Sequence, residues 1–325
     1  MRKIIFCALV ILLATALWAH DHAWAQWKPE FKFLKMATSR PGGKWFTLGA
    51  PVAKLWEKAL PGVRVSVLPG GGISNPKTVD AAEAKAGWAL TPDVYNAFHG
   101  NPPYKKKHPN LRHLGSLYPA YMEVVVPKKS DIQGFPDLYN KRISGGAIGF
   151  TTLEILKFIL ASYDINFEKI KASGGSIVYL NYSDMVLNMK DGHLDAAGFM
   201  GGIPFAPIIE LNVQPGLRFL KIDKAHLDKI VAKNPGFITA EIPKGMYKGQ
   251  NEAIPTVGAN TVLLVHKDLS EEAVYRMTKA VYENLNVLRE VTSTAKDIHL
   301  KTALKGMACP IHPGAKRFYD EKGIR

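Results

Sequence analysis

The stretch 39–46 has the residue types and the order of an anion-binding loop. A glycine pair ending at Gly43 follows an apolar strand, predicted for residues 31–37, and a helical pattern follows the pair. The first N–H groups of such a helix have no intrahelical acceptor, and with the helix dipole they attract negative charge. Lys44 adds a full positive charge, and Trp45 adds a flat apolar wall. The stretch predicts a site for a small carboxylate; the alternative is a glycine turn that binds nothing.

A second glycine loop, residues 145–150, follows a strand predicted for residues 142–144. Thr151 or Thr152 is predicted to cap the next helix, whose leucines repeat at helical spacing. The loop does not match the glycine fingerprint of dinucleotide-binding proteins. It predicts a second helix N-terminus that can hold an anion.

The elements that position these loops alternate between strands and helices, which is typical of parallel βα units. Loops 39–46, 70–75 and 91–93 each leave a strand, and in open α/β sheets ligands bind beyond the carboxyl ends of strands. The order of elements in residues 76–90 returns in residues 183–200. The chain is therefore predicted to form two α/β lobes that face each other across a cleft.

The first 25 of the 325 residues are predicted to be a signal peptide, with a basic start, an apolar core and cleavage after Ala25. The alternative is an uncleaved N-terminal anchor. Cys7 would leave with this segment, so Cys309 cannot form an intramolecular disulfide and is predicted to be a buried apolar residue. The formal net charge of +14 favours anionic partners. The one dense basic run, residues 105–107, lies among prolines and indicates a solvated loop rather than a nucleic-acid site.

Motifs of hydrolases, nucleotide-binding loops and metal sites are missing from the sequence. There is no H-E-x-x-H, C-x-x-C, G-x-S-x-G or Walker pattern, and the histidines are scattered. The sequence therefore predicts no catalytic residues, no metal ligands and no cofactor, and it leaves open whether a metal ion assists ligand binding.

Six short blocks stand in a specific order along the chain: Gly42–Phe46, Pro69–Gly72 with Asn75, Gly87–Asp93, Asp191–Ala197, Ile254–Val257 and His312–Ala315. In these blocks the chain resembles the TAXI group of solute receptors, the periplasmic binding proteins of certain TRAP transporters, over nearly its whole mature length. The resemblance implies a type II periplasmic binding protein fold, with two α/β lobes, a hinge and a ligand cleft between the lobes. It also implies a small organic anion as ligand and delivery to a membrane permease driven by an ion gradient.

Two positions depart from the family pattern. Lys44 stands where the family usually has threonine, and a charge-assisted hydrogen bond from Lys44 to a carboxylate would favour anions over amino acids. Pro51 falls within the predicted helix, where it either kinks the helix or marks its first turn.

The lobes are expected to comprise residues 26–120 with 256–325 (lobe I) and residues 121–255 (lobe II). The candidate ligand-binding residues are those that the loops and the predicted crossing between lobes bring to the cleft: Ser39, Gly43, Lys44, Trp45, Asn75, Thr91, Asp93, Tyr118, Thr151, Thr152, Gly201 and Pro204. For several of these residues a structural role competes with ligand binding. Asn75 and Asp93 are also good helix caps, Tyr118 fits the core as well as the cleft wall, and Lys44 fits a solvated surface.

We therefore expect a monomeric periplasmic receptor that captures a dicarboxylate, a 2-oxo acid or a glutamate-like acid. Its partners would be that small organic anion and the membrane subunits of a TRAP transporter. One alternative is a ligand-sensing module read by a membrane receptor, and a weaker one is an enzyme built on a binding-protein fold.

Overall fold

The computed structural model describes residues 28–40 and 43–325. The predicted signal peptide with its cleavage site after Ala25, the cysteine at position 7 and Gly42 lie outside these residues. Within them, no helix has the length and apolar character needed to cross a membrane.

Strands form where β-branched and other apolar residues predominate. They are β1 (Phe33–Ala37), β2 (Arg64–Leu68), β3 (Ala86–Leu90), β4 (Leu111–Pro127), β5 (Arg142–Ser144), β6 (Ser176–Ile177), β7 (Ala196–Gly201), β8 (Leu217–Phe219), β9 (Phe237–Ile242) and β10 (Ile254–His266).

Helices pack an apolar stripe against these strands. They are α2 (Lys44–Ala59), α3 (Ser74–Asp80), α4 (Thr91–His99), α5 (Thr151–Ser162), α6 (Phe167–Ala172), α7 (Tyr182–Lys190), α8 (Ala206–Val213), α9 (Lys224–Lys233), α10 (Glu271–Tyr282), α11 (Leu285–Val291) and α12 (Pro313–Glu321), with 3₁₀ turns η1 (Phe135–Leu138), η2 (Ser293–Asp297) and η3 (Leu300–Thr302).

The described strands form one mixed sheet in the order β2-β1-β3-β10-β4-β7-β5-β6, with β9 paired to β10 and β8 to β4. β1, β2 and β3 are parallel, and so are β5, β6 and β7. The long strands β4 and β10 run antiparallel to each other between these two parallel groups. β10 pairs with β3 towards its C-terminal end and with β9 at its N-terminal end. β4 pairs with β7 and β8 in its C-terminal half, so the pair β4 and β10 connects the two parallel groups.

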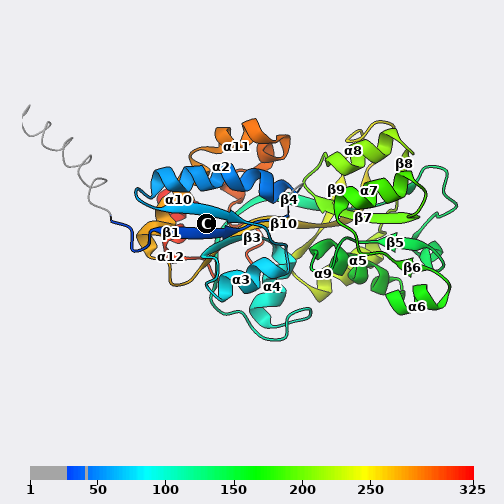
Figure 1. Cartoon of the computed structure of the whole chain (residues 1–325), viewed down its shortest axis with the longest axis horizontal. Coiled ribbons are helices and arrows are strands. Elements are labelled where there is room, and N and C mark those ends of the chain that lie inside the picture. Colours follow the sequence, from blue (N-terminus) through cyan, green and yellow to red (C-terminus); the bar gives the residue numbers. More distant parts are fainter. Residues whose placement is uncertain (1–27, 41–42) are drawn as a thin grey trace, which may run out of the picture.

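Figure 1 shows the two lobes side by side, joined by β4 and β10. In one lobe, α2 and α11 cover one face of the sheet and α3 and α4 the other. In the second lobe, α7 and α8 lie on one side and α5 and α9 on the other. The C-terminal helices α10 and α12 return to the first lobe, which is therefore built from both ends of the chain. The exact division near residues 120 and 255 remains a proposal.

Each lobe has an apolar core of its own. Trp56, Met277 and Phe318 are buried in the first lobe, and Leu156 and Ile159 in the second. Trp45 packs against both of these cores, which places it at the junction of the lobes. Cys309 is buried as predicted, and burial raises the pKa of its thiol to about 12.

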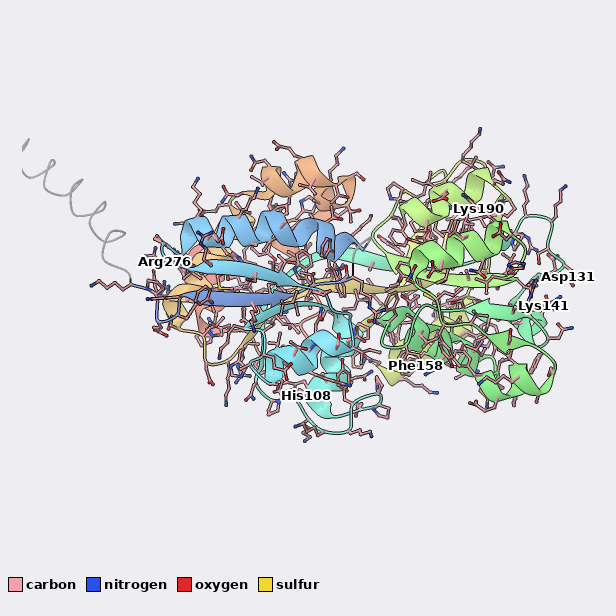
Figure 2. The ribbon with its side chains drawn as sticks, viewed as in Figure 1. His108, Asp131, Lys141, Phe158, Lys190 and Arg276 are labelled. Carbon is pink, nitrogen blue, oxygen red and sulfur yellow. The ribbon has the colours of Figure 1, made fainter. Side chains whose placement is uncertain are left out.

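Charged side chains occupy the outer surface, as Figure 2 shows for Asp131 and Lys141 at the far end of the second lobe. These two form an ion pair at 2.8 Å. Exposed pairs of this kind contribute little to stability.

Several predicted element boundaries are wrong. The apolar pattern predicts two strands, residues 111–118 and 121–126, separated by Pro119, but β4 is one continuous strand. Pro119 is accommodated beside an irregularity in the pairing with β10. α2 begins at Lys44 and contains Pro51, so Pro51 does not mark its first turn. Thr151 and Thr152 are not caps: Phe150 holds the N-cap position of α5, and both threonines are already helical.

Candidate functional site

A cavity of about 160 Å³ lies between the lobes, above the two crossing strands. Loops and helix ends of both lobes form its walls, and β4 and β10 form its floor. The lining residues are Ser39, Arg40, Gly43, Lys44, Trp45, Gly70, Gly71, Gly72, Leu90, Tyr118, Ala120, Phe150, Thr151, Thr152, Asn181, Tyr182, Ser183, Met200, Gly201, Gly202, Phe205, Pro207 and Thr261.

The N-termini of α2, α5 and α7 all reach the cavity wall. Gly43, Phe150 and Asn181 hold the N-cap positions of these helices. Each helix is at least nine residues long, and its first backbone N–H groups have no intrahelical acceptor. Three partial positive charges from two different lobes therefore meet at one cavity, which is an arrangement suited to an anion.

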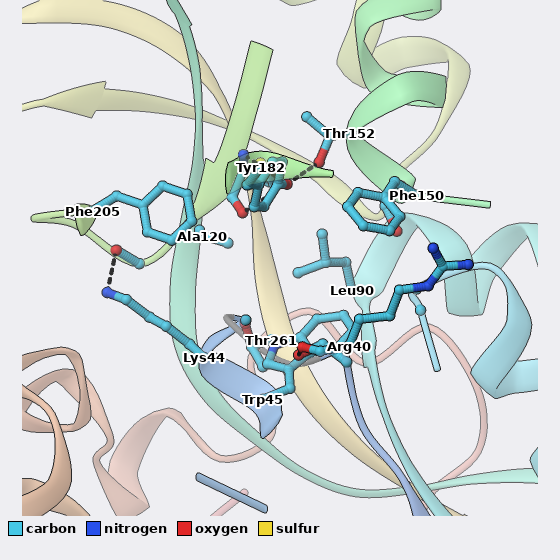
Figure 3. Close-up of a pocket in the computed structure, with 18 of the residues that line it drawn as sticks. Arg40, Lys44, Trp45, Leu90, Ala120, Phe150, Thr152, Tyr182, Phe205 and Thr261 are labelled. Carbon is cyan, nitrogen blue, oxygen red and sulfur yellow. Dashed lines mark hydrogen bonds between the residues drawn. The ribbon is translucent and has the colours of Figure 1, made fainter. Parts of the chain in front are cut away.

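Arg40 supplies a cation that the sequence interpretation missed. Its side chain is exposed and extends from the first lobe towards Phe150 of the second, with the guanidinium carbon 5.8 Å from the ring centroid (Figure 3). Cation–π contacts at exposed sites are worth about 0.5–1 kcal/mol, so this contact can give way to a ligand carboxylate. The position of Arg40 directly after Ser39, within the predicted anion-binding loop, is the sequence signal that could have identified it.

Lys44 lines the cavity, but its ammonium group is already bonded to protein. Nζ donates to the carbonyl of Gly202 at 2.5 Å, to the carbonyl of Pro204 at 3.3 Å and to the hydroxyl of Thr294 (Figure 3). Burial lowers the pKa of Lys44 to about 8, although Glu123 and Asp297 oppose this shift. Lys44 therefore links the start of α2 to the end of β7 in the second lobe, instead of pointing a free charge into the cavity.

Asp93 and Thr151 make a second contact between the lobes. The Thr151 hydroxyl donates to Oδ2 of Asp93 at 2.5 Å, and both side chains are buried. Burial raises the pKa of Asp93 to about 7, and the Thr151 hydrogen bond only partly opposes this. Asp93 is thus a buried structural acceptor and does not line the cavity as a counter-ion for a ligand amine.

The glycine loop at 70–72 fits closely against these residues. A Cβ atom at Gly72 would lie 1.7 Å from Thr151 Oγ1 and 2.5 Å from Asp93 Oδ2. A Cβ atom at Gly71 would lie 3.2 Å from the carbonyl oxygen of Gly149 in the other lobe. Only residues without a side chain allow the two lobes to approach this closely on this side of the cavity.

Eight of the twelve predicted site residues line the cavity: Ser39, Gly43, Lys44, Trp45, Tyr118, Thr151, Thr152 and Gly201. The other four, Asn75, Thr91, Asp93 and Pro204, do not. Whether the eight contact a ligand stays a prediction.

The four that fall outside the lining have structural partners. Asn75 is buried and donates to the carbonyls of Thr38 and Trp88 at 2.7 and 2.8 Å. The Thr91 hydroxyl donates to the carbonyl of Gly236. Pro204 contributes its carbonyl oxygen to Lys44. These residues shape and support the wall.

Most of the apolar wall was not predicted from the sequence. Phe150, Tyr182 and Phe205 surround one side of the cavity, and Leu90 and Met200 extend it. The Tyr182 hydroxyl bonds to the Thr152 hydroxyl, which fixes its ring at the start of α5 (Figure 3). Aromatic residues in helices and after strands also occur in any core, so no local pattern distinguished these.

No group of three or more histidine, cysteine, aspartate or glutamate side chains able to hold a metal occurs in residues 28–40 and 43–325. The lining residues also include no carboxylate side chain among those described. The groups of the lining that could bind an anion are therefore backbone N–H groups, hydroxyls and Arg40.

The sequence profile of the NMT1-like family matches residues 36–323 of this chain. Among solved structures, a protein from Bordetella bronchiseptica RB50 is 14% identical, with a TM-score of 0.57, covering 91% of this chain and 100% of that one. A Xanthomonas citri protein bound to chloride ion is 9% identical, with a TM-score of 0.51 and coverage of 89% and 95%.

A third structure, from work on glutathione import through GshT in Streptococcus mutans, is 15% identical, with a TM-score of 0.50 and coverage of 82% and 96%. At these identities the likeness concerns the fold. The predicted type II periplasmic binding protein fold is confirmed.

Proposed function

The chain belongs to the NMT1-like family, and we propose that it is a periplasmic receptor that captures a small organic anion between its lobes and delivers it to membrane subunits of a transporter. The observation that carries this proposal is the meeting of three helix N-termini from two lobes at one cavity. A ligand that contacts all three can bind well only when the lobes are together, so binding and closure are coupled.

The chemistry of the lining supports an acid without an ammonium group. An amino acid would bring a positive charge next to three helix N-termini and Arg40, and among the described lining residues there is no carboxylate to pair with it. A dicarboxylate, a 2-oxo acid or another carboxylic acid fits this lining better than a glutamate-like ligand. We propose binding and release, with no chemical step.

A TRAP-type transporter is the partner that we propose, within the TAXI group. The six sequence blocks support this finer assignment. Three of them supply cavity residues, namely those that contain Gly43, Gly72 and Leu90. The permease would recognise the form in which Lys44 and Thr151 hold the lobes together.

Titration of the protein with a panel of acids tests the proposal. The panel consists of succinate, 2-oxoglutarate, glutamate, benzoate and 4-hydroxybenzoate, added to protein that has been unfolded, dialysed and refolded to remove any bound ligand. Because Trp45 lines the cavity, we expect at least one acid to change tryptophan fluorescence saturably, and Trp45→Phe to reduce this signal while calorimetry still detects binding. Flat curves by both methods across the panel would contradict the proposal.

Replacing Lys44 with methionine should weaken binding of the tightest acid of the panel about 10-fold. Methionine removes donors from two carbonyls of the second lobe, and a hydrogen bond from a charged group is worth roughly 1.5–3 kcal/mol. The burial that lowers the pKa of Lys44 offsets part of this gain, so we expect the lower end of that range. Isothermal titration calorimetry measures the change. Lys54→Met, on an exposed position of the same helix, is the matched control, and equal affinities in the two variants would exclude Lys44 as a link between the lobes.

A further inference from the structure

The floor of the cavity contains a pair of hydroxyl groups without partners. In the ladder between β4 and β10, Pro119 pairs with Asn260 and Ser116 with Val262, so Leu117 and Tyr118 together oppose the single residue Thr261. Two residues opposite one make a β-bulge, a feature that re-aims side chains and is frequent beside functional sites. Tyr118 and Thr261 are both part of the cavity lining.

Neither hydroxyl is satisfied by the described protein atoms. Tyr118 is 2% exposed and Thr261 1% exposed, and both oxygen atoms lack a hydrogen-bond partner of proper geometry. Thr261 and Trp45 approach the Tyr118 hydroxyl, but their weak hydrogen bonds only partly oppose the rise in its pKa that burial causes. Buried polar groups in native proteins are nearly always well hydrogen-bonded, so a poorly bonded pair of hydroxyls on a cavity floor leaves room for a further partner on a ligand.

The size and walls of the cavity restrict the rest of the ligand. A volume of about 160 Å³ is close to that of the engineered cavity of about 150 Å³ that binds benzene. The rings of Trp45, Phe150, Tyr182 and Phe205 are positioned around it, with Leu90 beside them. Aromatic side chains favour stacked or edge-to-face contacts with another ring. A flexible aliphatic diacid could make no such contacts with this wall.

The start of α5 and the floor around Thr261 lie on different sides of the cavity. Figure 3 shows Thr261 and Trp45 on one side, and Thr152, Tyr182 and Phe150 on the other, with the Arg40 side chain extending towards Phe150. A ring between them can place a carboxylate at the N-termini of α5 and α7, and a substituent across the ring at the floor.

We propose that the ligand is a single-ring aromatic carboxylate whose ring carries a hydroxyl group opposite the carboxylate, and that Tyr118 and Thr261 select this hydroxyl. The proposal rests on the proposed function, which it narrows to one class of acid. It assigns Tyr118 and Thr261 to specificity, and the helix N-termini with Arg40 to the carboxylate.

Calorimetry with 4-hydroxybenzoate, benzoate, cyclohexanecarboxylate and succinate tests the proposal. We expect 4-hydroxybenzoate to bind about 10-fold more tightly than benzoate, the difference expected for one net hydrogen bond at a buried site. Cyclohexanecarboxylate should bind more weakly than benzoate, because it lacks the flat face that the aromatic wall contacts. Succinate should bind most weakly.

Two variants locate the preference for the hydroxyl group. Tyr118→Phe and Thr261→Val preserve side-chain shape, and each should bring the affinity ratio of 4-hydroxybenzoate to benzoate close to one. Tyr104→Phe is the matched control, since Tyr104 also has a buried, unpartnered hydroxyl but lies outside the cavity lining. In that control the ratio should stay about 10.

The possible results separate this proposal from the function on which it rests. If succinate or 2-oxoglutarate binds and the ring acids do not, the aromatic ligand is excluded and the anion receptor stands. If no acid binds, both fail. Equal affinities for benzoate and 4-hydroxybenzoate in the unaltered protein, or a ratio that survives in both variants, would overturn the role of Tyr118 and Thr261.

Discussion

Gly72→Ala should weaken binding of the tightest acid by roughly 10- to 100-fold. The added Cβ atom would meet Thr151 Oγ1 at 1.7 Å and Thr151 Cβ at 3.1 Å. Thr151 belongs to the second lobe and Gly72 to the first, so the overlap with Thr151 can be relieved by moving the lobes apart. The contact of the added Cβ with Asp93 Oδ2, at 2.5 Å, lies within the first lobe and persists. Overpacking of this kind costs about 1–3 kcal/mol, and each 1.4 kcal/mol corresponds to a factor of ten in affinity.

Two measurements separate an effect of Gly72→Ala on lobe closure from an effect on folding. Thermal unfolding without ligand should change less than the affinity, because the closest overlap, with Thr151, arises when the lobes meet and only the contact with Asp93 remains when they separate. Calorimetry should show the loss of affinity. Thr151→Ala in the Gly72→Ala background removes the nearest atom and should recover part of the loss. Gly134→Ala is the control, since a Cβ atom there has only an ordinary contact with Pro136. Unchanged affinity in Gly72→Ala would mean that the lobes do not close as described.

The fold could be predicted because its signals are local and repeated. Alternation of strand and helix patterns indicated two α/β lobes, and each glycine corner marked a strand end at the cleft. The corners at Gly43 and Thr151 do meet at one cavity, although they are over one hundred residues apart. The rule that ligands lie beyond the carboxyl ends of strands was sufficient for this.

The details of the site could not be predicted, because they depend on partners far apart in the sequence. Lys44 has the same local sequence whether it binds a ligand or the carbonyl of Gly202, 158 residues away. Asp93 is a plausible cap in sequence, but its accepted hydrogen bond comes from Thr151 across the cleft. The role of each residue depends on contacts that form only when the two lobes are assembled.

Thr261 could not be predicted as a site residue for a different reason. It lies in β10, whose residues are almost all buried, and a threonine in such a strand normally reads as part of the core. Its position on the cavity floor comes from the bulge opposite Leu117 and Tyr118, and Pro119 was interpreted as a break between strands rather than as a neighbour of that bulge. A proline in a central strand is itself a signal of irregular pairing, and this was the information that the sequence did offer.

Glu123 is an unusual buried acid at the junction of the lobes. It lies in β4, is fully buried, and neither carboxyl oxygen has a hydrogen-bond partner of proper geometry among the described residues. Burial raises the pKa of Glu123 to about 8, while the neighbouring Tyr247 hydroxyl and Lys44 oppose the shift. At neutral pH the folded protein therefore keeps this carboxyl mostly protonated.

Glu123→Gln should increase the free energy of unfolding by about 3 kcal/mol at pH 7. The unfolded chain ionises Glu123 above its ordinary pKa of 4.5, whereas the folded protein holds the proton up to about pH 8. Because the folded state binds more protons in this window, the stability of the unaltered protein falls as the pH rises from about 4.5 to 8. A shift of one pKa unit corresponds to 1.36 kcal/mol, and glutamine imitates the protonated carboxyl without ionising.

Chemical denaturation at a series of pH values from 4 to 8.5 measures this difference. The stabilities of the variant and the unaltered protein should converge near pH 4 and separate progressively above it. Asp93, whose pKa burial raises to about 7, contributes a slope of the same sign that remains in the variant. Glu290→Gln, at an exposed position of α11, should leave the pH profile of the unaltered protein in place. A difference between Glu123→Gln and the unaltered protein that is constant across this range would show that Glu123 is ionised in the folded state, because a permanently charged carboxylate gives no proton uptake on folding.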